Sequence, residues 1–240
     1  MNKPLGIIFD LGDTVIEYEK SDPIEGTRRI IEISNNPRGI TAEEIQKLAI
    51  NLTKDVFDNR DRASLEVSFQ SFQRLLYEHF DITFNKDLEE IEKLFIKHAF
   101  KGKPSAGINE LFYILDKYQI KYCALSNSSF TGKTLKYELE EYGLYPNFKF
   151  IMSSCDYCLR KPNKKLFDLA SYKLGIEPQN IWVIGDSYDY DVKGANNSGM
   201  YPVWINKRDR KNTEKIDLLE VKSMEKITKI IDVVYRLSDI

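Results

Sequence analysis

The chain has 240 residues, with 35 lysine and arginine residues against 37 aspartate and glutamate residues and a net charge of −2. This length predicts one large domain, or one domain with a sizeable insertion. The balanced charge argues against nucleic-acid binding, no apolar run approaches a membrane span, and the first residues lack the pattern of a signal peptide. Three cysteines in so long a chain do not suggest a disulfide framework, so we expect a cytoplasmic protein without a membrane partner.

The first predicted element is a buried strand over residues 6–9, and a stretch without strand signals follows it from residue 17 to residue 101. Helix-start signals at Pro23, Thr41, Ser64 and Asn85 divide this stretch into four amphipathic helices. We therefore predict a helical cap domain over residues 17–101, inserted into a core made of residues 1–16 and 102–240. Residues 101–104 are interpreted as the hinge by which the chain returns.

After the insertion, short apolar runs alternate with helical patterns. The predicted strands cover residues 122–125, 148–152, 181–184 and 201–205, and a short helix is expected over 191–199. A polar loop over 206–215 leads to a last amphipathic helix that includes Met224 and Val234. Such alternation predicts a three-layer α/β, Rossmann-like core with a mainly parallel sheet and crossover helices.

Polar side chains follow several of these strands, where ligands bind in open parallel sheets. They are Asp10 after the first strand, Ser126 and Asn127 after the second, Lys161 beyond the third, and Asp186, Asp189 and Asp191 after the fourth. Carboxylate oxygens suit Mg²⁺, and a lysine suits phosphate oxygens. An aspartate can also attack phosphorus to form an aspartyl-phosphate. The set therefore indicates a site for Mg²⁺ and a phosphate.

These residues occur in four ordered segments: Asp-Leu-Gly-Asp-Thr at 10–14, Leu-Ser-Asn at 125–127, Arg-Lys-Pro at 160–162, and Gly-Asp-Ser at 185–187 with Asp191. In order and spacing, the segments resemble the motifs of the haloacid dehalogenase-like (HAD) hydrolase superfamily. The helical insertion resembles the small α-helical cap of that superfamily. The resemblance covers essentially the whole chain.

The resemblance implies a role for each matching residue. Asp10 would be the nucleophile, Ser126 and Asn127 would bind substrate, and Lys161 would stabilise charge on the nucleophile and the phosphate. The implied Mg²⁺ ligands are Asp10, the backbone carbonyl of Gly12, Asp186 and Asp191, with Asp189 set aside because the family favours the acid that opens the following helix. We therefore expect a Mg²⁺-dependent phosphatase of a small phosphorylated metabolite, acting as a monomer or homodimer.

One position departs from the family pattern. Phosphatases of the family usually carry a second aspartate two residues after the nucleophile, and here that position is Gly12. Loss of a general acid typically costs about 10²–10⁴ in rate. Asp13 could substitute, the substrate could have a leaving group that needs little protonation, or the chain could be a phosphate-binding or regulatory protein with weak turnover.

Alternative hypotheses about the function depend on fewer residues. A carbon–halogen hydrolase would use Asp10 but leave the acid cluster unexplained, and a phosphonate-cleaving enzyme would need a cap lysine such as Lys47, Lys54, Lys93 or Lys97. Cys155 and Cys158 have the spacing of redox or zinc sites, but further soft ligands are few, so we interpret them as incidental thiols. Arg60 and Arg62 of the cap could face an anionic substrate, although an exposed charged turn is the plainer interpretation.

Overall fold

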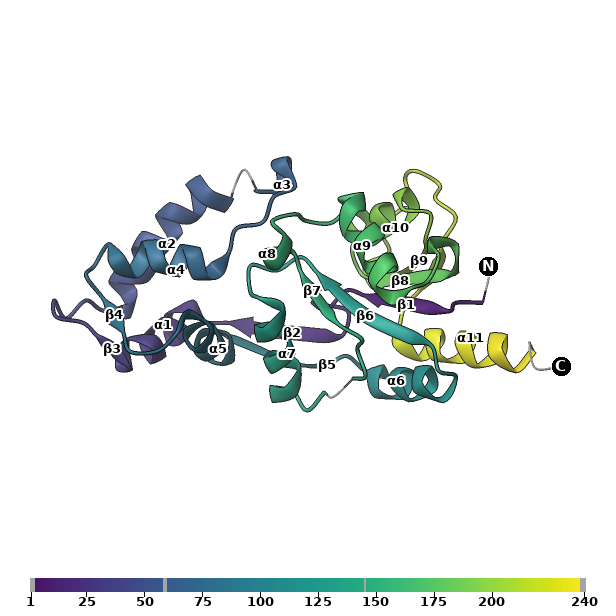
Figure 1. Ribbon diagram of the computed structural model, residues 1–240, viewed down its shortest axis with the longest axis horizontal. Coiled ribbons are helices and arrows are strands. Elements are labelled where there is room, and N and C mark those ends of the chain that lie inside the picture. The colour runs from purple at the N-terminus through teal and green to yellow at the C-terminus, as the bar shows by residue number, and fades with distance from the viewer. Residues whose placement is uncertain (1–2, 58–59, 145, 238–240) are drawn as a thin grey trace.

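Six parallel strands form the sheet that positions the predicted site (Figure 1). The computed structural model describes residues 3–57, 60–144 and 146–237. Across the sheet, the strand order is β10 (Leu219–Val221), β9 (Tyr201–Ile205), β8 (Ile181–Gly185), β1 (Gly6–Phe9), β6 (Lys121–Ser126) and β7 (Ile151–Ser153). The strand predicted over 148–152 begins only at Ile151, and β10 was not predicted. The parallel sheet itself is confirmed.

Helices cover both faces of the sheet. One face packs against α6 (Ile108–Lys117), α7 (Gly132–Glu141) and α11 (Met224–Leu237), and the other against α9 (Lys164–Leu174) and α10 (Lys193–Asn197). In β1, Ile7 and Phe9 point to the first group of helices and Ile8 to the second. The central strands are apolar on both sides because each side is buried. The three-layer α/β fold is therefore confirmed.

The cap region lies to one side of the sheet in Figure 1. Its helices are α1 (Pro23–Glu32), α2 (Ala42–Phe57), α3 (Arg60–Ala63), α4 (Phe69–Glu78) and α5 (Leu88–Ala99). The predicted starts at Pro23 and Thr41 are confirmed: Glu44 N–H donates to Thr41 Oγ1, and Thr41 N–H donates to the Glu44 carboxylate. The other two starts were wrong, because Ser68 rather than Ser64 caps α4 and Asp87 rather than Asn85 caps α5.

Short strands connect the cap region with the core, so the prediction of a strandless stretch from 17 to 101 was wrong. β2 (Ile16–Ser21) pairs antiparallel with β5 (Phe100–Pro104), and within the cap β3 (Ser34–Asn35) pairs with β4 (Thr83–Phe84). The proposed hinge at 101–104 is therefore part of β5. The proposed domain boundaries fall within this two-stranded ribbon, and the division itself stays a prediction.

Three shorter helical segments complete the described structure. They are α8 (Ser154–Tyr157), η1 (Pro178–Asn180) and η2 (Tyr188–Val192). The helix expected over 191–199 is thus the end of η2 followed by α10. Within the described ranges, none of the helices combines the length and the apolar character that a membrane crossing requires.

A buried carboxylate joins the cap to the core. Glu92 of α5 is fully buried and accepts hydrogen bonds from Thr131 N–H (3.1 Å), Thr131 Oγ1 (2.8 Å) and Thr134 Oγ1 (2.7 Å) at the start of α7. Gln70 of α4 donates to the same carboxylate at 3.1 Å. The negative charge also suits the N-terminal end of a helix. Glu92 therefore holds two cap helices against the core.

We expect Glu92→Ala to lower the free energy of unfolding by about 2–3 kcal/mol, because it leaves buried donors without an acceptor. Urea denaturation measures this loss. The matched control is Glu89→Ala, one turn earlier on the same helix, where the partly exposed ion pairs with Lys93 and Lys133 are worth less than about 1 kcal/mol. Equal losses in the two variants would contradict the role assigned to Glu92.

Candidate active site

One cavity of about 340 Å³ lies at the carboxyl ends of the strands. Because β1 lies between β6 and β8, residues that follow these three strands meet at one edge of the sheet. All the residues predicted for the site line this cavity: Asp10, Gly12, Ser126, Asn127, Lys161, Asp186 and Asp191. Asp189 does not line it; it is exposed and forms an ion pair with Lys193 at 2.8 Å.

A buried lysine connects two of the carboxylates. Lys161 Nζ donates to Asp10 Oδ1 at 2.7 Å and to Asp191 Oδ1 at 2.6 Å, and the lysine is only 3% exposed. Burial lowers the pKa of Lys161, but attraction to Asp10 and Asp191 outweighs it and holds the pKa above its ordinary value. The ammonium group therefore stays charged and offsets part of the negative charge of the site.

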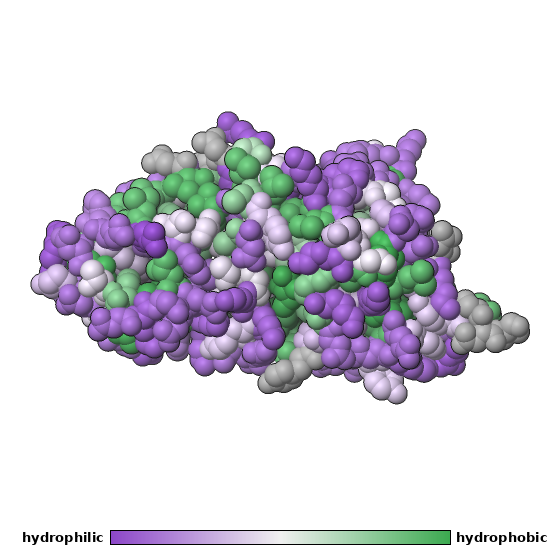
Figure 2. Space-filling view, in the orientation of Figure 1, coloured by the Kyte–Doolittle hydropathy of each residue, from purple (hydrophilic) through white to green (hydrophobic). Residues whose placement is uncertain are grey.

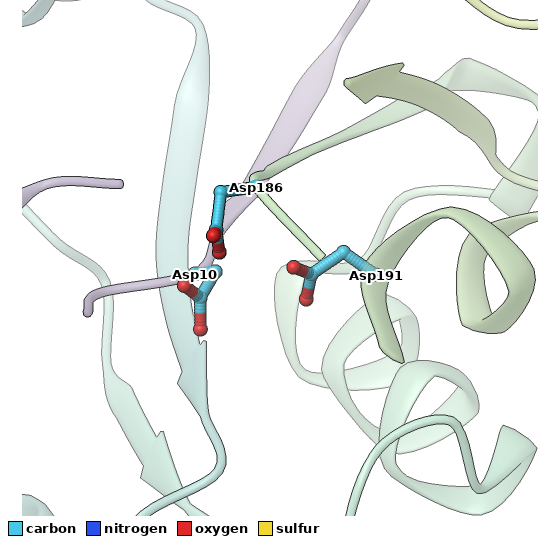
Figure 3. Close-up of side chains that lie close together, drawn as sticks. All are labelled: Asp10, Asp186 and Asp191. Atoms are coloured by element: carbon cyan, nitrogen blue, oxygen red, sulfur yellow. The ribbon is translucent and has the colours of Figure 1, made fainter. Parts of the chain in front are cut away.

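Three carboxylates face a common space (Figure 3). An oxygen from each of Asp10, Asp186 and Asp191 lies within 4.8 Å of the others. Burial raises the pKa of Asp10, with Lys161 opposing this shift and Asp191 adding to it. Burial and then repulsion from Asp10 and Asp13 raise the pKa of Asp186 from its ordinary 3.8 to about 6. The pKa of Asp191 is raised by burial despite its contact with Lys161.

This donor set fits a magnesium ion. Mg²⁺ prefers carboxylate oxygens, with waters and phosphate completing its coordination, and a cation would offset the remaining repulsion. Asp191 is already engaged at both oxygens, since Oδ1 accepts from Lys161 and Oδ2 accepts from Ser187 N–H at 3.0 Å. Asp10 and Asp186 are therefore the freer ligands, and Asp191 is best placed to fix Lys161.

A glycine makes room for Asp191. A Cβ added at Gly185 would lie 2.3 Å from the Asp191 carboxyl carbon, which is far inside contact distance. Any larger residue at the end of β8 would displace the carboxylate that holds Lys161. The glycine before Asp186 thus serves close packing within the site.

Asn127 fixes the loop that carries the lysine. Its side chain accepts from Lys161 N–H at 2.7 Å and donates to the Lys161 carbonyl at 3.1 Å. These two bonds hold the Lys161 backbone against the end of β6. A substrate contact for Asn127 stays a prediction, as does phosphate binding by Ser126, which is nearly buried at the cavity wall.

The loop before Lys161 is also bound to the cap, which the sequence did not predict. The Glu66 carboxylate accepts from Arg160 Nη1 and from Ser154 Oγ at 2.6 Å, and the backbone N–H of Glu66 donates to the Cys158 carbonyl at 3.1 Å. Arg160 itself lines the cavity. No local pattern signals this contact, because Glu66 and Arg160 are 94 positions apart.

A tyrosine lies beside the position that lacks the expected acid. A Cβ built at Gly12 would lie 3.4 Å from the ring of Tyr18, and Tyr18 also lines the cavity. The Tyr18 hydroxyl donates to the carboxylate of Glu138, 2.9 Å away. Burial raises the pKa of Glu138 to about 7. Asp13 lines the same cavity from an exposed position with a positive φ of 55°.

The remaining candidates do not line the Asp10 cavity. The four cap lysines Lys47, Lys54, Lys93 and Lys97 do not line the cavity, and the last two form ion pairs with Glu89 and Glu141. Arg60 contacts Glu66 at 3.7 Å, and Arg62 is exposed. All three cysteines are free, and neither Cys155 nor Cys158 belongs to the acidic group.

The family model described as haloacid dehalogenase-like hydrolase matches residues 7–205. The pyrimidine 5'-nucleotidase PynA of Streptococcus pneumoniae is 22% identical, with 92% of this chain and 98% of that protein covered. A glyceraldehyde 3-phosphate phosphatase of Methanocaldococcus jannaschii is 24% identical, with 97% of each chain covered.

A solved structure has the same fold. The Bacillus subtilis protein YfnB, in a crystal structure bound to magnesium, has a TM-score of 0.58 and 19% identity, covering 96% of this chain and all of that one. At this identity the likeness concerns the fold alone. The family model, by contrast, spans most of the chain and includes all four motifs. This chain therefore belongs to the haloacid dehalogenase-like hydrolases.

Proposed function

We propose that the protein is a Mg²⁺-dependent phosphatase that acts on a small phosphorylated metabolite through an aspartyl-phosphate on Asp10. The observation that carries the proposal is the buried Lys161 ammonium, held between Asp10 and Asp191 with Asp186 beside them. Relatives that act on phosphomonoesters by name, PynA and the glyceraldehyde 3-phosphate phosphatase, support the same reaction class.

The proposed reaction has two displacements. A carboxylate oxygen of Asp10 forms a bond to phosphorus as the bond to the leaving oxygen breaks, and that oxygen takes up a proton. Water then attacks the aspartyl-phosphate, which releases phosphate and restores the Asp10 carboxylate. Lys161 and Ser126 would bind the phosphoryl oxygens, and the cap would limit access of bulk water.

Asp10, the Gly12 carbonyl and Asp186 would hold the metal, with Asp191 in support. Bound Mg²⁺ would neutralise charge that builds up on the phosphoryl group. All three cysteines are free, which agrees with a reducing compartment, and we propose a cytoplasmic location on that ground. A monomer or homodimer is proposed as the working form.

Gly12 supports a second candidate function, a phosphate-binding or regulatory protein with weak turnover. Its position lacks a side chain, and the nearby Tyr18 hydroxyl is bonded to Glu138. Asp13, or a substrate whose leaving group needs little protonation, would instead preserve turnover. Phosphate release by the Asp10→Asn and Gly12→Asp variants distinguishes weak turnover from efficient turnover.

We expect Asp10→Asn to lower kcat by at least about 10³-fold, because the amide oxygen is a poor nucleophile. The measurement is phosphate release from a panel of phosphomonoesters and acyl phosphates, with Mg²⁺ and with chelator. Asp168→Asn, an exposed change on α9, is the control and should leave the rate unchanged. Release that persists in a folded Asp10→Asn protein would refute the nucleophile.

We expect Gly12→Asp to raise kcat by about tenfold or more on alkyl phosphates, because it supplies a general acid. The gain should be smaller on acetyl phosphate, whose leaving group needs little protonation. The new Cβ fits, since its nearest neighbour is the Tyr18 ring at 3.4 Å. Gly12→Asn is the matched control, with the same shape but no acid. If the aspartate variant gains nothing, the proton comes from Asp13 or another acid, or the substrate needs none.

We expect Mg²⁺ to bind about tenfold more weakly at pH 5 than at pH 7, because protons compete for Asp186, whose pKa is about 6. The raised pKa also means that proton binding favours the folded, metal-free protein at low pH. This contribution to the free energy of unfolding is lost as the pH rises through 6. The Mg²⁺-induced rise in Tm should therefore grow between pH 5 and pH 7.

Titration calorimetry and thermal denaturation provide the two readouts. Asp186→Asn should abolish the Mg²⁺ effect at every pH. Asp189→Asn, an exposed acid three residues later that forms an ion pair with Lys193, should leave it intact. A Mg²⁺ response that does not change between pH 5 and pH 7 would show that Asp186 is not a ligand.

A further inference from the structure

A second cavity adjoins the Asp10 cavity on the cap side. It has a volume of about 420 Å³ and lies between helices α1, α2, α4 and α5 and the core loop that contains Ser129. Phe100 and Phe130 line both cavities. We call it the cap cleft and define it by Gln73 and six phenylalanines: Phe57, Phe69, Phe72, Phe95, Phe100 and Phe130. Its size is typical of a small-molecule site.

Aromatic rings lead from the Asp10 cavity into the cap cleft. Tyr18, which lines the first cavity, lies with its ring centroid 5.9 Å from that of Phe100, and Phe100 lies 5.7 Å from Phe130. Phe130 lies 4.7 Å from Phe69, and Phe69 lies 4.6 Å from Phe95. Hydrophobic residues also gather over α2 and toward α3 on the face shown in Figure 2. A flat apolar group would find ring faces and edges along this path.

One polar side chain in the cap cleft lacks a partner. Gln73 is 1% exposed, and neither its amide oxygen nor its amide nitrogen has a hydrogen-bond partner in the part of the chain that the structure describes. Gln46, which lines the same cleft, differs: its amide donates to Thr27 Oγ1 at 2.5 Å. Buried amides are normally satisfied, so the Gln73 amide calls for a ligand group that both donates and accepts.

The chemistry of the cleft restricts its occupant. A sugar carries many hydroxyl groups that this mainly apolar lining could not satisfy, and an alkyl chain would leave the Gln73 amide unpaired. A nucleobase meets both demands, since it has an aromatic face for stacking and a donor–acceptor edge for an amide. Among the described residues that line the cleft, the cationic one is Arg60, which contacts Glu66 and the Phe57 ring.

Since this arginine is already engaged by a carboxylate, the phosphate group of a substrate is better placed beside Lys161 in the adjoining cavity.

We propose that the substrates are nucleoside monophosphates, with the phosphate at Asp10 and Lys161, the base among the phenylalanines of the cap cleft, and its polar edge on Gln73. This inference rests on the proposed phosphatase function and names its substrate class. It makes Gln73 a specificity-determining residue.

The first test compares uridine and adenosine 5'-monophosphates with ribose 5-phosphate. Ribose 5-phosphate has a hydroxyl where the two nucleotides have a base, and the leaving oxygen is the same in all three compounds, so any shortage of a general acid affects them equally. We expect kcat/KM to be about 10–100-fold higher for the nucleotides, the range that base stacking on aromatic side chains provides. Equal values, with hydrolysis still dependent on Asp10, would overturn the nucleobase site and leave the phosphatase proposal standing.

The second test uses Gln73→Leu, with Gln46→Leu as the matched control in the same cleft. Gln73→Leu should lower kcat/KM for the nucleotides by about tenfold and leave ribose 5-phosphate unchanged. It should also raise the Tm of the ligand-free protein, because it removes an unpaired buried amide. Gln46→Leu breaks a bond that is already made, so it should lower the Tm. Unchanged discrimination in a folded Gln73→Leu protein would overturn the role of Gln73.

A third measurement is independent of turnover. Uridine and adenosine, which carry no phosphate, are titrated into the full-length Asp10→Asn protein by calorimetry. Binding that weakens about tenfold on adding Gln73→Leu supports the site, and absence of binding overturns it. If the wild-type protein hydrolyses none of the phosphates, the phosphatase proposal fails, and this titration alone decides whether the cap cleft binds bases.

Discussion

The site depends on one buried charge, the ammonium group of Lys161. Three carboxylates at the edge of a parallel sheet would repel each other and would be driven toward their neutral forms by burial. Lys161 contacts two of them directly, Asp10 at 2.7 Å and Asp191 at 2.6 Å. Removing a single partner from such a buried arrangement leaves an uncompensated charge, which is costly. Burial, and then repulsion from Asp10 and Asp13, raise the pKa of Asp186, and a divalent cation would offset that repulsion.

The loop that carries Lys161 also contacts the cap. Asn127 holds the lysine backbone against β6, and the preceding residue, Arg160, forms an ion pair with Glu66 at the edge of the cap. Glu92 fastens α5 to the start of α7. The loop that places the ammonium group beside Asp10 is therefore also the surface on which the cap sits. The Glu66–Arg160 pair therefore links the cap to the loop that carries Lys161.

Local patterns were enough to predict the strands that carry Asp10, Ser126 and Asp186, because these strands are apolar on both sides and their polar residues follow directly. They could not predict β2 and β5, whose charged residues resemble those of a loop and whose paired positions lie 79 (Ser21 and Phe100) to 88 (Ile16 and Pro104) residues apart in the chain. The same holds for Glu66, Tyr18 and Gln73. The role of Glu66 depends on Arg160 and that of Tyr18 on Glu138, which are both distant in the sequence. The role of Gln73 depends on its lack of a hydrogen-bond partner among the described residues. Only the folded structure shows these features.

The glycine at position 12 and the cap cleft both concern how the barrier to phosphoryl transfer would be lowered. Without a general acid beside the leaving group, more of the barrier has to be lowered by orientation and by charge stabilisation. Binding energy from a part of the substrate remote from the reacting atoms can serve this purpose when it positions the phosphate against Asp10. The aromatic path from Tyr18 to Phe69 would supply such energy. A substrate that lacks the base would then lose kcat as well as affinity, because the cleft would contribute to the reaction as well as to recognition.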